Sequence, residues 1–203
     1  MMVMVERVWP RLSLVREGCL AAGGVALLAL TAQVQVPMWP VPLTGQTFGV
    51  LLLGALYGPG RAAWTTVLYL ATGALGLPVF AGGAFGAARL VGPTGGYLAG
   101  FVAAAALVGW LSRRGWDRSA ATAFAAMLAG AATIHLFGVL WLATLVGWGP
   151  AVTAGLLPFI PGDLVKAGLA ALALPAGWRL LGRRSPGRQE RPEPRRPEDQ
   201  DGA

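Results

Sequence analysis

Long stretches without a charged residue constrain the fold of this chain more than any other feature. No Asp, Glu, Lys or Arg occurs in residues 18–60, 62–88, 90–112, 119–162 or 167–178. A helix needs about 20 mostly apolar residues to cross a hydrocarbon core of roughly 30 Å. The whole chain is 55% hydrophobic and 12% charged, whereas about 25% of the residues are charged in ordinary soluble domains. The sequence therefore predicts an all-α integral membrane protein.

Clusters of Pro and Gly divide the uncharged stretches into shorter segments, because Pro removes a backbone donor and Gly tolerates the backbone angles of turns. The segment Val36–Pro42 separates the first two spans, and Gly58–Gly60 ends the second. We expect about six transmembrane helices within a membrane domain of residues 18–183. The predicted spans cover about residues 18–36, 42–57, 62–77, 93–111, 120–146 and 162–181.

The ends of the chain are polar. Residues 1–17 are expected to form an N-terminal segment outside the membrane. Residues 184–203 consist mainly of Arg, Glu, Asp, Pro, Gln and Gly, so this tail has too few apolar side chains to bury and is predicted to be disordered.

The distribution of arginines predicts the orientation in the membrane. Six spans place both termini on one side, and 14 of the 16 Lys and Arg residues fall on that side. Cytoplasmic loops carry the excess of Lys and Arg in membrane proteins, so both termini are predicted to be cytoplasmic. The same bias explains the net charge of +7. We therefore expect membrane lipid, and not nucleic acid, as the surrounding partner.

Three charged residues remain on the outer half of the protein: Arg89, Asp163 and Lys166. A charge within the bilayer costs about 2.5–3.5 kcal/mol on insertion scales, so such residues usually face a cavity or a partner. Asp163 and Lys166 are three residues apart, which places them on one helical face where they can form a pair. These charges predict an outward-facing pocket for a small polar molecule, and their net charge of +1 favours an anionic ligand.

A purely structural interpretation of these charges is also possible. Asp163 would cap the last helix and pair with Lys166, while Arg89 would extend to the membrane interface. His135 is the single histidine, and we expect a lone histidine in an apolar span to be a hydrogen-bonded packing residue.

Several absences limit the possible functions. Lys166 is the only lysine, so the chain contains no glycine-rich phosphate loop ending in Gly-Lys-Ser/Thr and cannot use ATP by that route. Cys19 is the only cysteine, which excludes an internal disulfide and a cysteine-based metal site. The four serines lie near the predicted cytoplasmic edge, and no acid or nucleophile is near His135 in the sequence. An enzyme is therefore disfavoured, and no metal or cofactor is expected.

Four ordered stretches resemble a known family. They are PVPLTGQTFGVLLLGALYGP (Pro40–Pro59), LGLPVFAGG (Leu75–Gly83), GPTGGYLAGF (Gly92–Phe101) and LLPFIPGDLVKAGLA (Leu156–Ala170). Together they make the chain similar to the BioY family, the biotin-specific substrate-binding (S) subunits of energy-coupling factor (ECF) transporters. The resemblance extends over roughly residues 22–173.

The resemblance implies a six-helix bundle in the bacterial plasma membrane that captures biotin from outside. It also implies partners, namely a transmembrane coupling subunit and two ATPase subunits that supply the energy. In this family, small residues on the first span dock the coupling subunit, and Ala22 and Ala26 match that pattern.

The resemblance further implies which residues bind biotin. Asp163 and Lys166 match the family's PGDLxK motif, and Arg89 matches an arginine that precedes GPTGG. We expect Asp163 to accept from the ureido N–H groups, Lys166 to donate to the ureido oxygen or the carboxylate, and Arg89 to bind the carboxylate.

Five further residues complete the expected site. Phe80, Tyr97 and Trp141 are expected to pack against the thioether ring and the valerate chain, since a ligand pocket is mostly apolar with a few placed polar groups. Gln46 and Thr44 are possible additional hydrogen-bonding residues.

Three alternatives to a biotin-binding subunit are less consistent with the sequence. An S subunit for thiamin or riboflavin would share the docking surface, but the PGDLVK and GPTGG stretches argue against it. A small membrane enzyme would need a catalytic set that the sequence does not offer. A purely structural subunit would leave the three outer charges without a role.

Overall fold

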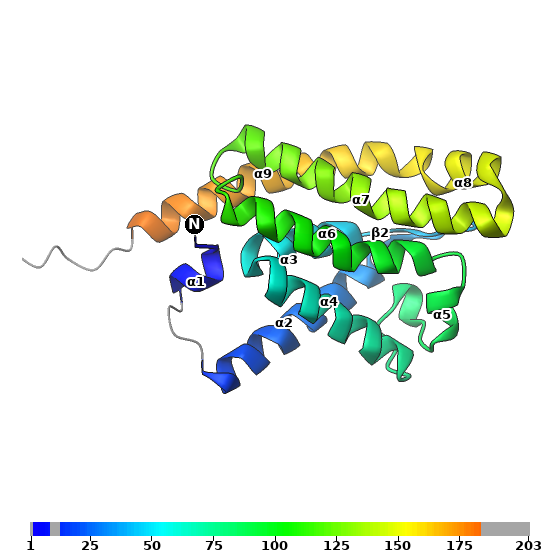
Figure 1. The fold of residues 1–203 in the computed structure, drawn as a ribbon, viewed down its shortest axis with the longest axis horizontal. Helices are drawn as coiled ribbons and strands as arrows, with labels where there is room; N and C mark the ends of the chain where they lie inside the picture. The colour runs from blue at the N-terminus through cyan, green and yellow to red at the C-terminus, as the bar shows by residue number, and fades with distance from the viewer. Residues whose placement is uncertain (1, 9–12, 184–203) are drawn as a thin grey trace, which may run out of the picture.

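The computed structural model describes residues 2–8 and 13–183. Helices pack side by side, some running close to the long axis of the molecule and others obliquely to it (Figure 1). The long ones are α2 (Leu14–Gln33), α3 (Gln46–Tyr57), α4 (Pro59–Ala74), α6 (Gly95–Arg113), α7 (Ala120–Val146) and α9 (Ile160–Arg183). Each predicted span overlaps one of these helices. The predicted tail, residues 184–203, lies outside the described residues.

Not all of these helices are long enough to cross a bilayer alone. Within the described residues, four stretches have the length and composition of a membrane span: α2, α6, α7 and the stretch Trp148–Leu181. By contrast, α3 has 12 residues and reaches only ~18 Å at 1.5 Å per residue. The predicted second span is shorter than expected because residues 35–44 form a hairpin instead of helix.

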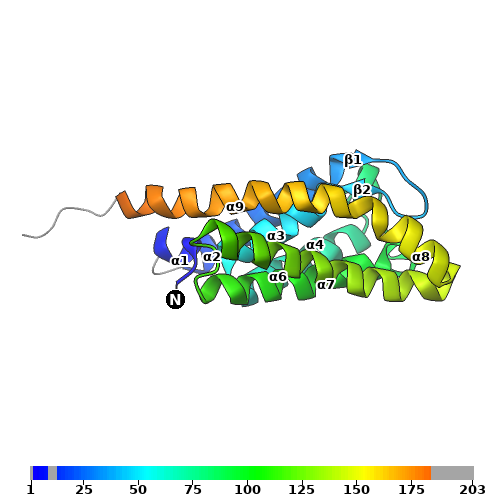
Figure 2. The same cartoon turned by 90° about the horizontal axis from the view of Figure 1, so that it is seen from above.

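That hairpin is one of several short elements that the sequence did not predict. Strand β1 (Gln35–Val36) pairs antiparallel with β2 (Leu43–Thr44), with Gln35 opposite Thr44. The other short elements are α1 (Met4–Val8), α5 (Ala88–Val91), α8 (Trp148–Gly155) and the 3-10 turns η1 (Ala81–Gly83) and η2 (Leu157–Phe159). Figure 2 shows α9 along one side of the bundle, with α8 at its far end.

Local sequence explains where the main helices begin. Ser13 and Ser119 cap α2 and α7, each accepting a hydrogen bond from a backbone N–H three residues later. Between α3 and α4, Gly58 has a φ of 80°, which favours glycine, and Pro59 occupies the first turn of α4. The chain therefore reverses direction at this corner without a longer loop.

Helix α6 lies at the centre of the bundle and packs on α3, α4 and α7, while α9 packs on α7. The α3–α6 contact depends on a glycine. A Cβ atom on Gly54 would lie 2.8 Å from the carbonyl oxygen of Ala105, so only a hydrogen fits there. Close backbone approach through small residues is typical of helices that pack within membranes.

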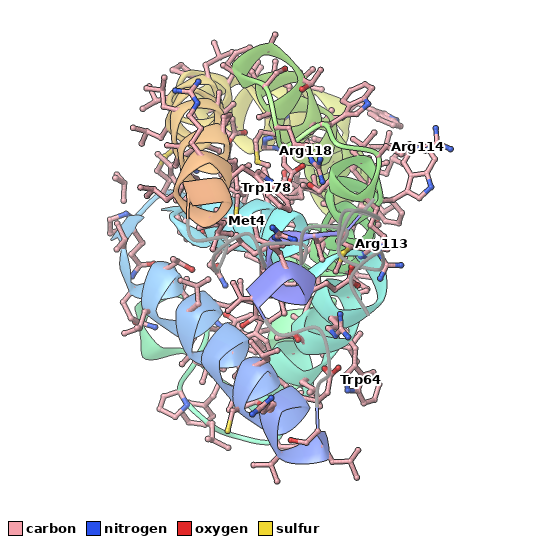
Figure 3. All side chains as sticks on the ribbon, turned by 90° about the vertical axis from the view of Figure 1, so that its left-hand side faces the viewer. Met4, Trp64, Arg113, Arg114, Arg118 and Trp178 are labelled. Carbon is pink, nitrogen blue, oxygen red and sulfur yellow. The ribbon has the colours of Figure 1, made fainter. Side chains whose placement is uncertain are left out.

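Ion pairs and cation–π contacts hold together the end of the bundle where the N-terminus lies. Glu6 accepts hydrogen bonds from Arg61 at 3.2 Å and from Arg113 at 2.8 Å. Figure 3 views this end, where Arg118 lies over the Trp178 ring, 4.6 Å from its centroid. The C-terminal end of α9 lies at the same end (Figure 1). Both ends of the described chain are therefore on one side of the bundle.

Candidate functional site

A pocket is lined in part by residues of α5 and of the first turn of α6, which lie at the opposite end of the bundle (Figure 1). Its cavity has a volume of about 70 Å³, which is smaller than the ~300–1,000 Å³ usual for small-molecule sites. The pocket is lined by Val41, Pro42, Thr44, Gln46, Thr47, Phe80, Ala81, Ala84, Arg89, Thr94, Tyr97, Leu98, Phe101, Ile134, His135 and Phe159. Its wall is therefore mostly apolar, with a few polar groups.

Five residues that the sequence analysis named lie together in this wall: Thr44, Gln46, Phe80, Arg89 and Tyr97. They come from β2, the start of α3, the loop after α4, α5 and the start of α6. The fold thus brings to one cavity side chains that are up to 53 positions apart, from Thr44 to Tyr97.

Trp141 does not line this pocket. Its indole Nε1 donates to the carbonyl oxygen of Gly92 at 2.9 Å, and the residue is 38% exposed. A Cβ atom on Gly96 would lie 2.3 Å from the Cβ of Trp141, so the tryptophan packs closely on the first turn of α6. The structure therefore shows Trp141 fixing α6 against α7 from outside the cavity.

Asp163 and Lys166 lie behind the pocket wall and pair with each other. The Lys166 Nζ and the Asp163 Oδ1 are 3.4 Å apart, as the three-residue spacing predicted. Lys166 also donates to the carbonyl oxygen of Thr44 at 3.0 Å and to the Thr47 Oγ1 at 2.6 Å. Because Thr44 and Thr47 line the pocket, only these two residues separate the Lys166 ammonium group from the cavity.

His135 belongs to the same cluster, which the sequence analysis did not foresee. Its Nε2 lies 2.6 Å from the Asp163 Oδ2, and the residue is only 7% exposed. The ring packs edge-on against Phe159, with 5.5 Å between the centroids. The only signal in the sequence was an ionisable side chain in an uncharged span, because 28 residues separate His135 from Asp163.

Aromatic residues form the apolar part of the wall. Tyr97 stacks on Phe159 with an interplanar angle of 21°, and its hydroxyl donates to the Gly155 carbonyl oxygen at 2.7 Å. Phe80 meets Tyr69 edge-on at 5.6 Å between centroids. These contacts fix both rings, which is the preorganisation that a specific apolar site requires.

Gln46 is also fixed by hydrogen bonds. Its side-chain amide donates to the hydroxyl of Tyr69, and its Oε1 accepts from the Thr44 Oγ1 at 3.3 Å. The Tyr69 hydroxyl in turn donates to the Val79 carbonyl oxygen at 2.9 Å. This chain of hydrogen bonds connects β2 and α3 to the loop that carries Phe80.

Arg89 differs from the buried cluster because it lies on the exposed side of the pocket. Within the described part of the chain, no carboxylate pairs with its guanidinium group. A guanidinium group binds carboxylates in a bidentate manner. The pocket thus combines an arginine at one side with a buried Asp–His–Lys cluster behind another.

The described residues contain no group of three or more His, Cys, Asp or Glu side chains that could hold a metal ion.

The small residues of α2 divide between two surfaces. Gly24 faces the interior, where an added Cβ atom would lie 2.6 Å from the Thr65 side chain. Ala22 and Ala26 are exposed on the other face, as is Gly18, which has open space around it. The exposed face of small residues is therefore not used for packing within the described bundle.

Comparison with known proteins places the chain in a family. The sequence pattern that defines the BioY family matches residues 4–183. The chain is 42% identical over 157 residues to a probable biotin transporter BioY of Pyrococcus horikoshii, covering 77% of this chain and 93% of that protein. It is 36% identical over 173 residues to the biotin transporter BioY of Rhizobium etli, covering 80% of this chain and 92% of that protein.

A solved structure shares the fold. It is the S-component for biotin from an ECF-type ABC transporter, which matches with a TM-score of 0.71 and 26% sequence identity over 83% of this chain and 95% of that chain. The family match covers nearly all of the described residues, including every residue of the pocket wall. The chain belongs to the BioY family.

Proposed function

We propose that the chain binds biotin and takes it up across the membrane as the substrate-binding subunit of an ECF-type transporter. The observation that carries this proposal is the pocket, whose polar groups match the two polar ends of biotin. The relatives described above are named as biotin transporters, and the solved structure is a biotin S-component. These names support transport and not catalysis, and they argue against thiamin or riboflavin as the substrate.

Biotin has a carboxylate at one end and a ureido group with two N–H donors and one oxygen at the other. We assign the carboxylate to Arg89, which lines the pocket and is not paired within the described residues. The ureido ring faces the cluster of Asp163 and Lys166, and Gln46 and Thr44 are placed to add hydrogen bonds. Each end of the ligand then meets a group of complementary charge or hydrogen-bonding character.

The apolar middle of biotin packs against the rings of Phe80 and Tyr97. Both are buried, with 4% and 5% of their surface exposed, and both line the pocket. Trp141 acts indirectly in this proposal, because it holds the start of α6, where Tyr97 lies.

The fold and the positions of the arginines support one membrane topology. Six helices (α2, α3, α4, α6, α7 and α9) correspond to six membrane-embedded segments, of which α3 and α4 extend only part of the way. Arg113, Arg114 and Arg118 lie at the end that also holds both described termini (Figure 3), and Arg61 bonds there to Glu6 of α1, so that end is cytoplasmic by the positive-inside rule. The pocket then opens to the outside of the plasma membrane.

The energy for uptake comes from partner subunits. We propose that a transmembrane coupling subunit docks on the exposed small residues of α2, Ala22 and Ala26, and that two ATPase subunits hydrolyse ATP. Small side chains permit the close helix contact that such docking needs.

An uptake assay tests this function. The chain is expressed in a biotin-auxotrophic strain that lacks its own biotin transporter, together with the coupling and ATPase subunits, and radiolabelled biotin is supplied. We expect accumulation that excess biotin suppresses and that excess thiamin or riboflavin leaves unchanged. Absence of accumulation, with all subunits present in the membrane, would contradict the proposal.

Variants with bulky residues separate docking from binding. Ala22→Trp and Ala26→Trp should lower uptake while purified protein still binds biotin. Leu172→Trp is the matched control, because Leu172 is 72% exposed on another helix, α9. Equal loss of uptake in the control would argue against α2 as the docking surface.

A further inference from the structure

His135 occupies a special place in the buried cluster. It lines the pocket, whereas Asp163 and Lys166 do not. It is also 7% exposed, and its Nδ1 has no hydrogen-bond partner within the described part of the chain. A buried polar atom without a partner is costly, and such atoms in native proteins often point to a functional role or an unseen ligand.

The partner of the other ring nitrogen fixes the tautomer. A carboxylate only accepts hydrogen bonds, so the 2.6 Å contact between His135 Nε2 and Asp163 Oδ2 requires the proton on Nε2. In the neutral imidazole the Nδ1 then carries a free lone pair and is an acceptor. The Lys166 ammonium lies 3.4 Å from the other carboxylate oxygen.

The position of Asp163 indicates which way the Nε2 atom of the ring faces. Asp163 lines an apolar groove between α7 and the α8–α9 segment, together with Leu128, Leu164 and others, and His135 lines both this groove and the pocket. The Nε2 atom is directed toward Asp163, on the groove side. Nδ1 is buried and is the ring nitrogen that no described residue holds, on a residue that lines the pocket.

We propose that the Nδ1 of His135 accepts a hydrogen bond from an N–H group of the bound ligand. This inference rests on the proposed function, in which the ligand is biotin and the N–H belongs to its ureido ring. Asp163 then acts through His135, because it orients the imidazole and holds the proton on Nε2. Lys166 uses its three N–H donors on Thr44, Thr47 and Asp163, so it supports the pocket wall from behind.

Two substitutions of His135 distinguish contact with the ligand from positioning of Asp163. The Asn side chain places its amide close to the Nδ1 position, whereas the Gln side chain places its amide close to the Nε2 position. His135→Gln thus keeps a donor for Asp163 but loses the acceptor, and we expect a biotin affinity about 5- to 150-fold weaker than wild type. His135→Asn keeps the acceptor and should bind more tightly than His135→Gln.

The opposite order would overturn the inference. If His135→Gln binds biotin as wild type does and His135→Asn does not, His135 serves only to position Asp163. Thr133→Val is the matched control, because Thr133 lies on the same helix and its hydroxyl bonds only to the Ala129 carbonyl oxygen within the described residues, at 2.8 Å. It should bind biotin with unchanged affinity.

A measurement on the wild-type protein avoids any effect of substitution on folding. The chain has one histidine, so ¹⁵N-histidine labelling gives a single pair of ring-nitrogen NMR signals. We expect a protonated Nε2 in both states and an upfield shift of the Nδ1 signal when biotin is added, because that nitrogen accepts a new hydrogen bond. An Nδ1 signal that does not move at saturating biotin would overturn this inference and leave the proposed function intact. Failure of the wild type to bind biotin would overturn both.

Discussion

Removing the Lys166 ammonium should destabilise the protein even without ligand. Its Nζ donates three hydrogen bonds, to Thr44, Thr47 and Asp163. In Lys166→Met, the Asp163 carboxylate, 7% exposed, would keep His135 as its only side-chain partner within the described residues. Loss of one member of a buried ion pair costs about 3–5 kcal/mol.

The loss of stability expected for Lys166→Met is smaller than that range, because the Lys166–Asp163 contact is long, at 3.4 Å, and the lysine side chain is 17% exposed. We therefore expect a loss of about 2–3 kcal/mol in the free energy of unfolding. For a chain of this size that corresponds to a drop in Tm of about 4–12 °C. Tryptophan fluorescence during heating of the detergent-solubilised protein measures it.

A double variant tests the physical reason. Asp163→Asn combined with Lys166→Met removes both charges, so the pair of substitutions should cost less than the sum of the two single changes. Arg179→Met removes an exposed charge from the same helix and should leave Tm unchanged. The argument would be refuted if Lys166→Met unfolded at the same temperature as the wild type, or if the two substitutions had fully additive effects in the double variant.

Three further predictions concern the pocket and the cytoplasmic end. Arg89→Gln should weaken biotin binding about 10- to 100-fold but leave binding of biotin methyl ester unchanged, and calorimetry with both ligands checks this. Gly138→Ala places a Cβ atom 2.2 Å from the Tyr97 ring, so it should lower the free energy of unfolding and weaken the free energy of biotin binding by about 1–3 kcal/mol each, whereas Gly149→Ala, with open space around it, should change neither. Burial raises the pKa of Asp117 in the folded protein. The stabilisation that Asp117 contributes is therefore complete at a pH below its pKa in the unfolded chain, and it is lost as the pH rises through its pKa in the folded protein. Asp117→Asn should consequently have a higher Tm than wild type near pH 8 and lose this advantage toward about pH 4, and a difference that is independent of pH would contradict the assignment.

The sequence predicted contacts between residues that are close in the chain. Asp163 and Lys166 are one helical turn apart, so their pairing followed from helix geometry, and it is confirmed. The contacts of Lys166 with Thr44 and Thr47 span 122 and 119 residues. No local pattern encodes such a contact, so it became visible only in the fold.

The same limit explains what the sequence analysis missed. His135 was expected to be a hydrogen-bonded packing residue, which is confirmed, but its partner Asp163 was not identified because it lies on another helix. Trp141 was expected in the pocket, but helical periodicity alone did not show that its face of α7 packs on Gly92 and Gly96. Hydropathy also overestimated the second span, since an apolar run containing Pro40 and Pro42 is compatible with either helix or hairpin.

The most direct test of the account is biotin binding to the purified wild-type protein, measured by titration calorimetry beside Asp163→Asn and Lys166→Ala. The account predicts tight binding of biotin by the wild type without ATP or partner subunits, and strong loss of binding in both variants. Wild-type protein that is folded and does not bind biotin, or variants that bind it as the wild type does, would contradict the account.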